Sequence, residues 1–451
     1  MISEPAPSPR SSGDVCATCN PRPDPPRPGV TVRVSVFFDG TLNNRANTTA
    51  YPSLTAAQQK ARADSSYAND YSNVSKLEEV LQLPHVGFDH SFKIYVEGIG
   101  TLDGVDDSTY GAGTGLGDYG VPAKVERGMT RCEELITAAV RTNFTITQIV
   151  LDAFGFSRGA AAARNFVHEA LKADDGLAHR LTEAGYTVGS VVVRFVGLFD
   201  TVASYGVQHT NDTADLKLDA IRVAEKVVQL AAGEEHRANF RLTNIASAGG
   251  NGVEHYLPGV HSDIGGGYVD EVGDNLQLLD LDTTWVGAVE RAALDREVSW
   301  ALDRGWYELG EFAVNAGKPP GQMRRTRLEN GWNEIHVSRA HISNHYPRIP
   351  MHMMADYATQ KQLVWSSGLT ANYPITGDLV AAKATIEGAV RGSPAPDQDT
   401  WMNSMAPWHK QLRHRYLHMS SFYGSTVGAN APQWTAGGEL TGRRRRVVQA
   451  G

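Results

Sequence analysis

From Thr31 onward, short apolar stretches alternate with stretches in which apolar residues recur at helical spacing. The pattern predicts strands over residues 32–38, 92–96, 148–154, 191–199 and 240–245, separated by helices over residues 74–83, 123–140, 158–171 and 216–232. Strands that alternate with helices are typical of a mostly parallel sheet with helices on both faces. We therefore expect an α/β fold whose functional residues lie beyond the carboxyl ends of the strands.

The third predicted strand runs into the sequence Gly155-Phe156-Ser157-Arg158-Gly159, which is followed by a run of alanines. A G-x-S-x-G pentapeptide between a strand and a helix is typical of a nucleophile elbow, a sharp turn that presents a reactive serine. Glycine accounts for 45 of the 451 residues, so the pentapeptide alone is weak evidence. Its flanks supply the required context and make Ser157 the candidate nucleophile; a glycine-rich turn with an incidental serine is the alternative.

A serine hydroxyl needs a nearby imidazole to take its proton and a carboxylate to orient that imidazole. In α/β-hydrolases the acid and then the histidine follow the nucleophile along the chain. Asp200 ends the fourth predicted strand, and His261 lies in a glycine-rich loop. We predict a triad of Ser157, Asp200 and His261, although Asp200 is also suited to cap a helix. Three residues are alternatives for these roles: Asp263 as the acid, and His255 and His418 as the base.

An acyl-transfer reaction also needs donors that stabilise the oxyanion of its intermediate. One donor is expected from the backbone N–H of Arg158, the residue after the nucleophile. The other is expected from the loop after the first strand, at the backbone of Gly40 and Thr41. A plain turn at Asp39 and Gly40 is the alternative reading of that loop.

Three segments are predicted along the chain. Residues 1–29 hold eight of the 21 prolines and are expected to form a disordered leader. Residues 30–270 are expected to form an α/β-hydrolase catalytic core. Residues 271–451, with helices near 276–302 and 351–364, are expected to complete the sheet, form a cap and end in a basic tail. Six aromatic and methionine residues there are candidates for a lipid approach, with a place in the core as the alternative: Trp401, Met402, Met405, Trp408, Phe422 and Tyr423.

Composition excludes several classes of protein. The net charge of -8 gives no reason to expect nucleic acid as a partner, and no apolar run is long enough to span a membrane. The amino terminus lacks the basic and apolar regions of a standard signal peptide. Three cysteines are too few for a disulfide framework. We therefore expect synthesis in the cytoplasm.

No cofactor is predicted. Cys16 and Cys19 form an isolated C-x-x-C, which makes zinc improbable. Residues 98–120 carry four aspartates among glycines, but their spacing does not match a calcium loop, so we expect a flexible loop near the site entrance. Residues 443–446 form a four-arginine run, which is read either as a solvated tail or as a contact for anionic lipid.

Five blocks, in this order, resemble one known family. They are VFFDGTLNN at 36–44, EGIGT at 97–101 with GAGTGLG at 111–117, GFSRGAAAAR at 155–164, GLFDTVAS at 197–204 and GVHSDIGGGY at 259–268. As a set they are far more specific than the pentapeptide, and they are similar to the type VI secretion lipase effectors of the G-x-S-x-G class.

The resemblance implies a phospholipase of the A1 or A2 type that acts on membrane phospholipid as an antibacterial toxin. It also implies delivery by a type VI secretion spike or adaptor protein into the periplasm of a rival cell, and a cognate immunity protein in the producer. By the same resemblance Ser157 is the nucleophile, His261 the base and Asp200 the acid.

Two other functions are compatible with the residues. The first is a soluble carboxylesterase that uses the same triad on a non-lipid ester. The second is a non-catalytic binding protein built on a hydrolase scaffold, for which Ser157→Ala would leave every activity unchanged.

Overall fold

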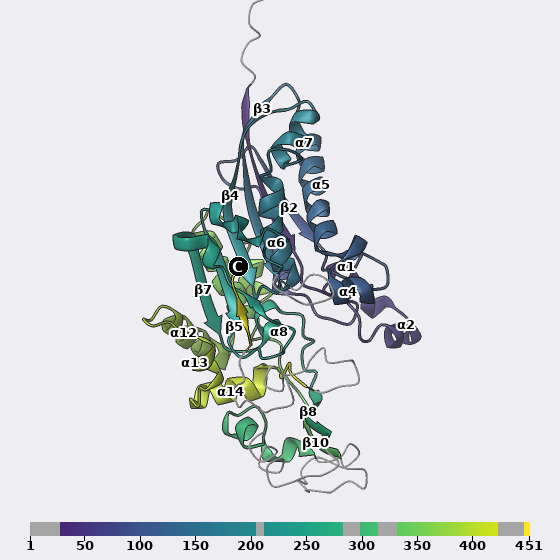
Figure 1. Ribbon diagram of the computed structural model, residues 1–451, viewed down its shortest axis with the longest axis vertical. Helices are drawn as coiled ribbons and strands as arrows, with labels where there is room; N and C mark the ends of the chain where they lie inside the picture. Colours follow the sequence, from purple (N-terminus) through teal and green to yellow (C-terminus); the bar gives the residue numbers. More distant parts are fainter. Residues whose placement is uncertain (1–27, 204–211, 283–297, 314–331, 423–445) are drawn as a thin grey trace, which may run out of the picture.

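The computed structural model describes residues 28–203, 212–282, 298–313, 332–422 and 446–451. Its centre is a parallel six-stranded sheet with the strand order β2-β1-β3-β4-β5-β7. The strands are β1 (Gly29–Phe38), β2 (His90–Val96), β3 (Thr145–Phe156), β4 (Thr187–Phe199), β5 (Val227–Ala232) and β7 (Gly252–Leu257). The predicted α/β class is confirmed, because the sheet is parallel and helices cover it (Figure 1).

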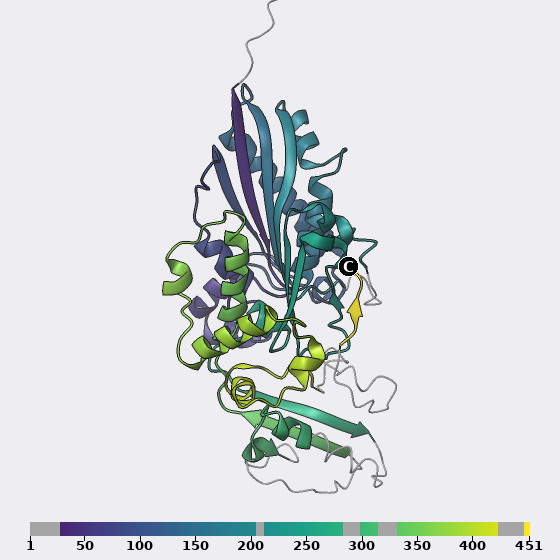
Figure 2. The same cartoon turned by 90° about the vertical axis from the view of Figure 1, so that its left-hand side faces the viewer.

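Apolar side chains alternate between the two faces of this sheet, as the two-residue period of a strand requires. In β1, Val36 and Phe38 join the core on one face, whereas Phe37 joins the core on the other. Three helices pack on the first face: α5 (Val121–Ala139), α6 (Arg158–Ala170) and α7 (Leu177–Glu183). On the second face lie α3 (Asn73–Val80) and α10 (Arg348–Thr359), the latter contributed by the carboxyl-terminal third (Figure 2).

The remaining helices are shorter or lie at the sheet's edges. They are α1 (Arg45–Ala50), α2 (Ala56–Ala61), α4 (Thr109–Thr114), α8 (His261–Gly265), α11 (Gly368–Ala371), α12 (Asp378–Val390), α13 (Gln398–Met402) and α14 (Pro407–Tyr416). Both α12 and α13 contact β7, so the carboxyl-terminal third covers the sheet from the β7 side. Short 3₁₀ segments add η1 (Tyr51–Ser53), η2 (Gly117–Tyr119), η3 (Leu218–Val223), η4 (Ala246–Asn251) and η5 (Leu309–Glu311).

Two small sheets stand apart from the central one. β8 (Asp274–Asp282), β10 (Trp332–Arg339) and β9 (Phe312–Ala313) form an antiparallel sheet at one end of the molecule (Figure 2). β11 (Val448–Gln449) pairs in parallel with β6 (Leu242–Thr243). This pairing brings residues near the end of the sequence to the edge where β4 and β5 terminate.

The structure differs from the sequence prediction in several elements, and β7 and β10 were not predicted. Residues 227–232 form strand β5 and not part of a helix, because a short, fully buried parallel strand is apolar throughout and cannot be distinguished from a buried helix by its period. Residues 274–282 form β8 where a helix was expected. The expected strand over 240–245 shrinks to the two residues of β6.

Among the described residues, no strand after β7 joins the central sheet, so the described part of residues 271–451 does not complete it as expected. In the described part of that segment, helices cover the sheet and β8, β9 and β10 form a sheet of their own. The predicted leader lies almost entirely outside the described residues, and β1 begins at Gly29.

Candidate active site

Ser157 lies at the turn between β3 and α6, as the G-x-S-x-G motif predicts. Its backbone has φ 58° and ψ -127°, a conformation that residues with a side chain rarely adopt. Its N–H donates to the carbonyl of Phe199 at 3.0 Å, and its carbonyl accepts from Val202 at 3.3 Å. The strained turn is therefore fixed against the end of β4.

Both glycines of the motif are required by close backbone contacts. A Cβ atom on Gly155 would lie 2.3 Å from the carbonyl oxygen of Gly159, and one on Gly159 would lie 2.2 Å from the carbonyl oxygen of Asp39. Backbone atoms cannot rotate away as side chains can, so neither position has room for alanine. The glycines thus allow α6 to start directly against β1 and β3.

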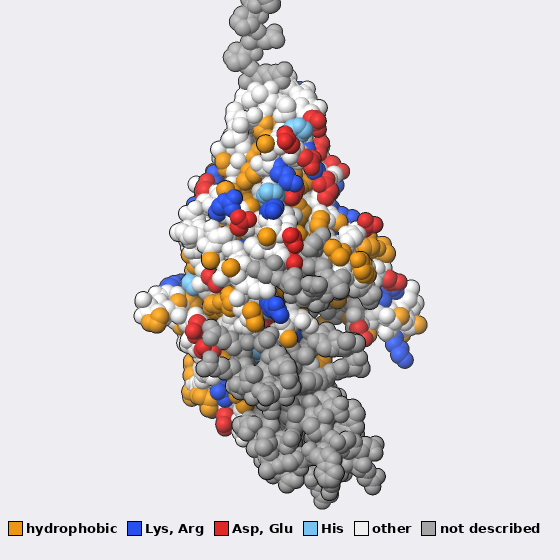
Figure 3. All heavy atoms as spheres, viewed as in Figure 1, with side chains coloured by type: hydrophobic (Ala, Val, Ile, Leu, Met, Phe, Trp, Pro, Cys, Tyr) orange, Lys and Arg blue, Asp and Glu red, His pale blue; other side chains and the backbone are white. Residues whose placement is uncertain are grey.

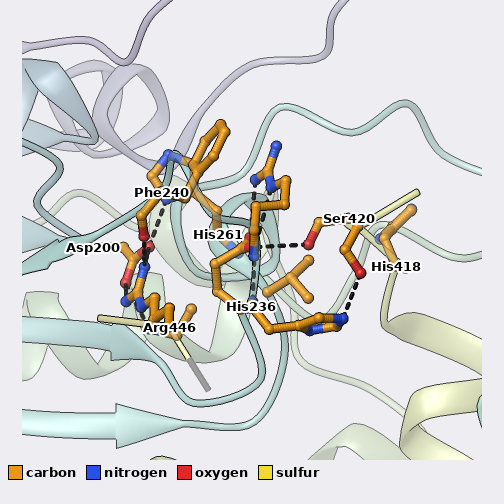
Figure 4. Close-up of polar contacts among 12 residues, drawn as sticks. Asp200, His236, Phe240, His261, His418, Ser420 and Arg446 are labelled. Carbon is orange, nitrogen blue, oxygen red and sulfur yellow. Dashed lines mark hydrogen bonds and ion pairs between the residues drawn. The ribbon is translucent and has the colours of Figure 1, made fainter. Parts of the chain in front are cut away.

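Asp200 and His261 form the hydrogen-bonded pair that a triad requires. Asp200 follows β4, the neighbour of β3, so it lies beside the serine at the same edge of the sheet. His261 is the first residue of α8, and its Nδ1 lies 2.5 Å from Oδ2 of Asp200 (Figure 4). With Nδ1–H donating to the carboxylate, Nε2 carries the lone pair that can accept a proton.

The imidazole of His261 is held between two aromatic rings. The ring of Phe156 lies 4.7 Å away and that of Phe240 4.9 Å away, centroid to centroid. Burial lowers the pKa of His261 below its usual value, and the hydrogen bond to Asp200 opposes this effect without reversing it. A histidine with a lowered pKa is neutral at pH 7 and is therefore in the form that a general base needs.

The carboxylate of Asp200 is fully buried and yet strongly ionised. Burial by itself would raise its pKa, but Arg446 and the hydrogen bond from His261 outweigh burial and lower the pKa of Asp200 to about 2. Its Oδ1 also accepts from the backbone N–H of Ala232 at 2.7 Å. The acid therefore stays charged over the whole physiological pH range.

Ser157 and His261 are both nearly buried, with 5 % and 4 % of their surfaces exposed. Among the described residues, no hydrogen bond joins the serine hydroxyl to the imidazole. Hydrogen bonds of catalytic groups are often long before substrate binds and tighten in the complex, so this geometry is compatible with a triad.

The backbone donors expected at the oxyanion site divide into two groups. The N–H of Gly40 donates to the carboxylate of Asp39 at 2.7 Å and is therefore occupied. Among the described residues, the N–H groups of Thr41 and Arg158 have no acceptor. The side chain of Arg158 donates from Nε to the Thr41 hydroxyl at 2.8 Å. This hydrogen bond links the two residues whose backbone N–H groups are free.

The alternative acid and bases are engaged elsewhere. Asp263 pairs with His418, whose Nδ1 lies 2.8 Å from Oδ1 of the carboxylate, and it also accepts from the backbone of Val260. His255 is hydrogen-bonded to the hydroxyl of Tyr357 at 2.7 Å. Asp263 and His418 thus form a second buried Asp–His pair, separate from the pair of Asp200 and His261.

Sequence reasoning missed two charged residues at the site. Glu235 accepts from the backbone N–H of His261 at 3.2 Å and from the hydroxyl of Ser420 at 3.0 Å, and so fixes the start of α8. Arg446 is fully buried against Asp200, so for this residue the expected solvated or lipid-binding tail was wrong. The three other arginines of the run lie outside the described residues. Only the folded chain brings Arg446 to Asp200, because 246 residues separate them.

Residues 98–120, which were expected to form a flexible loop, include the helix α4 and the 3₁₀ turn η2, and α4 contacts the first residue of α6. Asp106 pairs with Arg62, and Asp107 accepts from the backbone and hydroxyl of Ser66, so both carboxylates are used within the protein. The guanidinium of Arg158 donates to the carbonyl of Ala112 in α4. Over the described ranges, no three His, Cys, Asp or Glu side chains gather as a metal site would require. Cys16 and Cys19 lie outside those ranges.

The candidate lipid-approach residues separate into core and surface. Trp401 and Met402 are buried, so the core alternative holds for them. Met405 is 46 % exposed, and Trp408 and Phe422 are partly buried. Tyr423 lies outside the described residues. No helix in the described part of the chain is long and apolar enough to cross a membrane.

Part of the chain matches a known protein family. Residues 168–288 match the family model of the type VI secretion system phospholipase effectors described as Tle1-like, catalytic domain. The match includes Asp200 and His261, and Ser157 lies just before it. The expected resemblance to type VI secretion phospholipase effectors is thereby confirmed, whereas the matched residues begin after the G-x-S-x-G motif and do not test that class. No curated protein sequence matches the chain.

Two solved structures are similar to the model. One is the structure of the Tle1 effector bound to the VgrG spike of the type VI secretion system, at 24 % identity and a TM-score of 0.62, covering 94 % of this chain and 95 % of that one. The other is an uncharacterised protein from Pseudomonas aeruginosa, at 18 % identity and a TM-score of 0.41, covering 83 % of this chain and 52 % of that one. The first likeness shows that the fold extends over nearly the whole chain.

Proposed function

We propose that this protein is a serine phospholipase A, delivered by a type VI secretion system, in which Ser157, His261 and Asp200 form the catalytic triad. The observation that carries the proposal is the hydrogen-bonded His261–Asp200 pair beside a serine held on a strained strand-to-helix turn. The family match over residues 168–288 supports phospholipid as the substrate.

In the proposed reaction the Ser157 hydroxyl attacks the carbonyl carbon of an acyl ester, and Nε2 of His261 takes the hydroxyl proton. The oxyanion is stabilised by the N–H groups of Arg158 and Thr41, both of which are free to donate. The imidazolium then gives its proton to the departing lysophospholipid alkoxide. Water attacks the acyl-enzyme with His261 as base again, and fatty acid leaves.

A lipid substrate needs an apolar approach to the buried serine. The helix α4, which touches the elbow helix through Arg158, carries Tyr110 at 61 % exposure on its outer surface. Hydrophobic side chains gather at the right of Figure 3, level with α1 and α4 in Figure 1. We assign this surface, in preference to the buried Trp401 and Met402, as the side from which acyl chains approach.

The decisive experiment compares wild type, Ser157→Ala and Ser53→Ala on vesicles of phosphatidylethanolamine and phosphatidylglycerol, with fatty-acid release measured by mass spectrometry. Ser53 is an exposed serine in η1, and its alanine variant is expected to retain full activity. Ser157→Ala is expected to lose activity by about 10⁴-fold or more. Retention of activity in Ser157→Ala would exclude Ser157 as the nucleophile.

The same assay separates the finer proposals. Phospholipids with different acyl chains at the two glycerol positions report A1 or A2 cleavage. Rapid turnover of a water-soluble ester with no release from vesicles would favour the soluble carboxylesterase instead. Delivery by a spike or adaptor remains part of the proposal and is supported by the likeness to the spike-bound effector. Action in a rival's periplasm and a cognate immunity protein are further parts of the proposal.

A further inference from the structure

Arg446 makes a two-pronged contact with the proposed catalytic acid. Its Nη1 donates to Oδ2 of Asp200 at 2.9 Å, and its Nη2 donates to Oδ1 (Figure 4). Both side chains are completely buried. The guanidinium also donates to the carbonyl of Phe240 at 3.2 Å, the residue whose ring packs on His261. Arg446 therefore contacts both Asp200 and Phe240, the residue that packs on His261.

The backbone next to Arg446 is held in place by hydrogen bonds to other parts of the chain. Val447 accepts from the N–H of Leu242 at 3.0 Å, which begins the pairing of β11 with β6. The N–H of Thr243 in β6 in turn donates to the carbonyl of Thr201 at 3.0 Å. Thr201 directly follows Asp200, so the segment that carries Arg446 is tied to the acid by its backbone as well as by its side chain.

The four hydrogen-bond directions of the Asp200 carboxylate are all used. Two go to Arg446, one to His261 and one to the backbone of Ala232. The planar fork of an arginine matches a carboxylate in this two-bond geometry, and a lysine cannot reproduce it. Rotation of the carboxylate would break both arginine bonds at once, so the fork fixes the oxygen that faces His261.

Arg446 and His261 both contact the carboxylate of Asp200, so the charge of the arginine lies on the other side of that carboxylate from the imidazole. Glu235 and Arg237 from the loop after β5 act on the imidazole with opposite signs, and Glu254 and Tyr256 from β7 face the arginine. Arg446 and Asp200 together form a neutral ion pair next to the imidazole. Without the arginine, Asp200 would present an uncompensated charge, which favours the protonated imidazole.

On the basis of the proposed triad, we propose that Arg446 is a positioning residue for catalysis: it fixes the orientation of the Asp200 carboxylate and limits how strongly that carboxylate raises the basicity of His261. Its action reaches the substrate only through Asp200 and His261. Arg446 lies in the carboxyl-terminal segment, outside the sequence motifs that contain Ser157, Asp200 and His261.

The test compares Arg446→Gln and Arg446→Lys by the pH profile of kcat/KM on a water-soluble ester. Arg446→Gln is expected to lower kcat by about 10- to 100-fold, the loss typical when the hydrogen-bond partner that orients a metal-ligating side chain is removed. The acid limb of the kcat/KM profile of Arg446→Gln is expected to move up by roughly one pH unit, because loss of a neighbouring positive charge makes His261 easier to protonate. Arg446→Lys keeps the charge, so its acid limb is expected to stay in place while kcat falls.

Arg33→Gln is the matched control for lost stability. Arg33 is also a fully buried arginine paired with an aspartate, Asp152, but within the sheet. We expect this variant to lower Tm and to leave the acid limb unchanged. If Arg446→Gln behaves in the same way, with unchanged kcat per folded molecule, Arg446 is structural only and the proposal is overturned. If Arg446→Gln does not fold, a folded Arg446→Lys with wild-type kcat overturns it equally.

An NMR titration of the His261 imidazole separates this proposal from the proposed function, because it needs no turnover. The signal is assigned by its loss in His261→Ala, and its pKa is expected to rise in Arg446→Gln. If the pKa of His261 rises in Arg446→Gln but the wild-type protein hydrolyses no ester, the role of Arg446 toward Asp200 and His261 stands and only the proposed enzyme function is overturned. An unchanged pKa in an active enzyme would overturn the role of Arg446 alone.

Discussion

Replacing Asp200 by asparagine tests the assignment of the acid most directly. An asparagine offers one acceptor oxygen where the carboxylate accepts from His261, from the backbone of Ala232 and from both Nη atoms of Arg446. If the amide NH₂ faces His261, the imidazole must carry its proton on Nε2 and cannot act as base. If it faces Ala232, the N–H of that residue and one arginine nitrogen lose their acceptor.

Both orientations also leave the charge of Arg446 uncompensated. We therefore expect kcat to fall by about 10³- to 10⁴-fold, which corresponds to about 4–5.5 kcal/mol in the activation barrier. The free energy of unfolding is expected to fall by roughly 3–5 kcal/mol, the usual cost of removing one partner of a buried ion pair. Initial rates on vesicles and on a soluble ester, with denaturant unfolding of the same preparations, measure the two effects.

Asp263→Asn provides a matched control, because Asp263 is likewise buried and paired with a histidine, His418. It is expected to lower stability while the rate per folded molecule stays within several-fold of wild type. A loss of less than tenfold in Asp200→Asn, together with a large loss in Asp263→Asn, would refute the reasoning and make Asp263 the acid.

Further predictions concern the elbow and the response to acid. Gly159→Ala would place a methyl group 2.2 Å from the backbone oxygen of Asp39, so α6 must shift and kcat is expected to fall by about 10²-fold. Gly388→Ala in α12, whose new methyl group meets nothing within 4 Å, is expected to leave kcat unchanged, and equal kinetics of the two variants would contradict the role of the close contact. Burial raises the pKa of Asp200 and Glu234, but their cationic partners outweigh it and lower both to about 2. Because these values lie below those of the unfolded chain, the two carboxylates stabilise the fold above about pH 4.5, and roughly 2–3 kcal/mol from each is lost as pH falls toward 2. Urea unfolding as a function of pH measures this loss, and a flat stability between pH 5 and 3 would contradict it.

The site was predictable from sequence to the extent that each residue belongs to a local pattern. Ser157 stands in a pentapeptide between a strand and a helix, and Asp200 directly follows an apolar strand. Parallel strands end at one edge, so residues at neighbouring strand ends must meet. The free backbone donor at Arg158 follows from the same turn. Which of Thr41 and Gly40 offers a free N–H could not be predicted from the sequence, because it depends on whether the Asp39 carboxylate accepts the Gly40 N–H.

The remainder of the site depends on contacts between distant parts of the chain. The sequence by itself determined the α/β class, the strand-to-helix turn at Ser157 and the positions of Asp200 and His261 as candidate partners, since these rest on periodicity, glycine sterics and the ends of strands. Only the tertiary structure decided that Asp263 pairs with His418, that β5 is a strand, and that Arg446 lies on Asp200 and not in solvent. A buried ion pair is set by which surfaces the folded chain brings together, and no local pattern in the sequence records that.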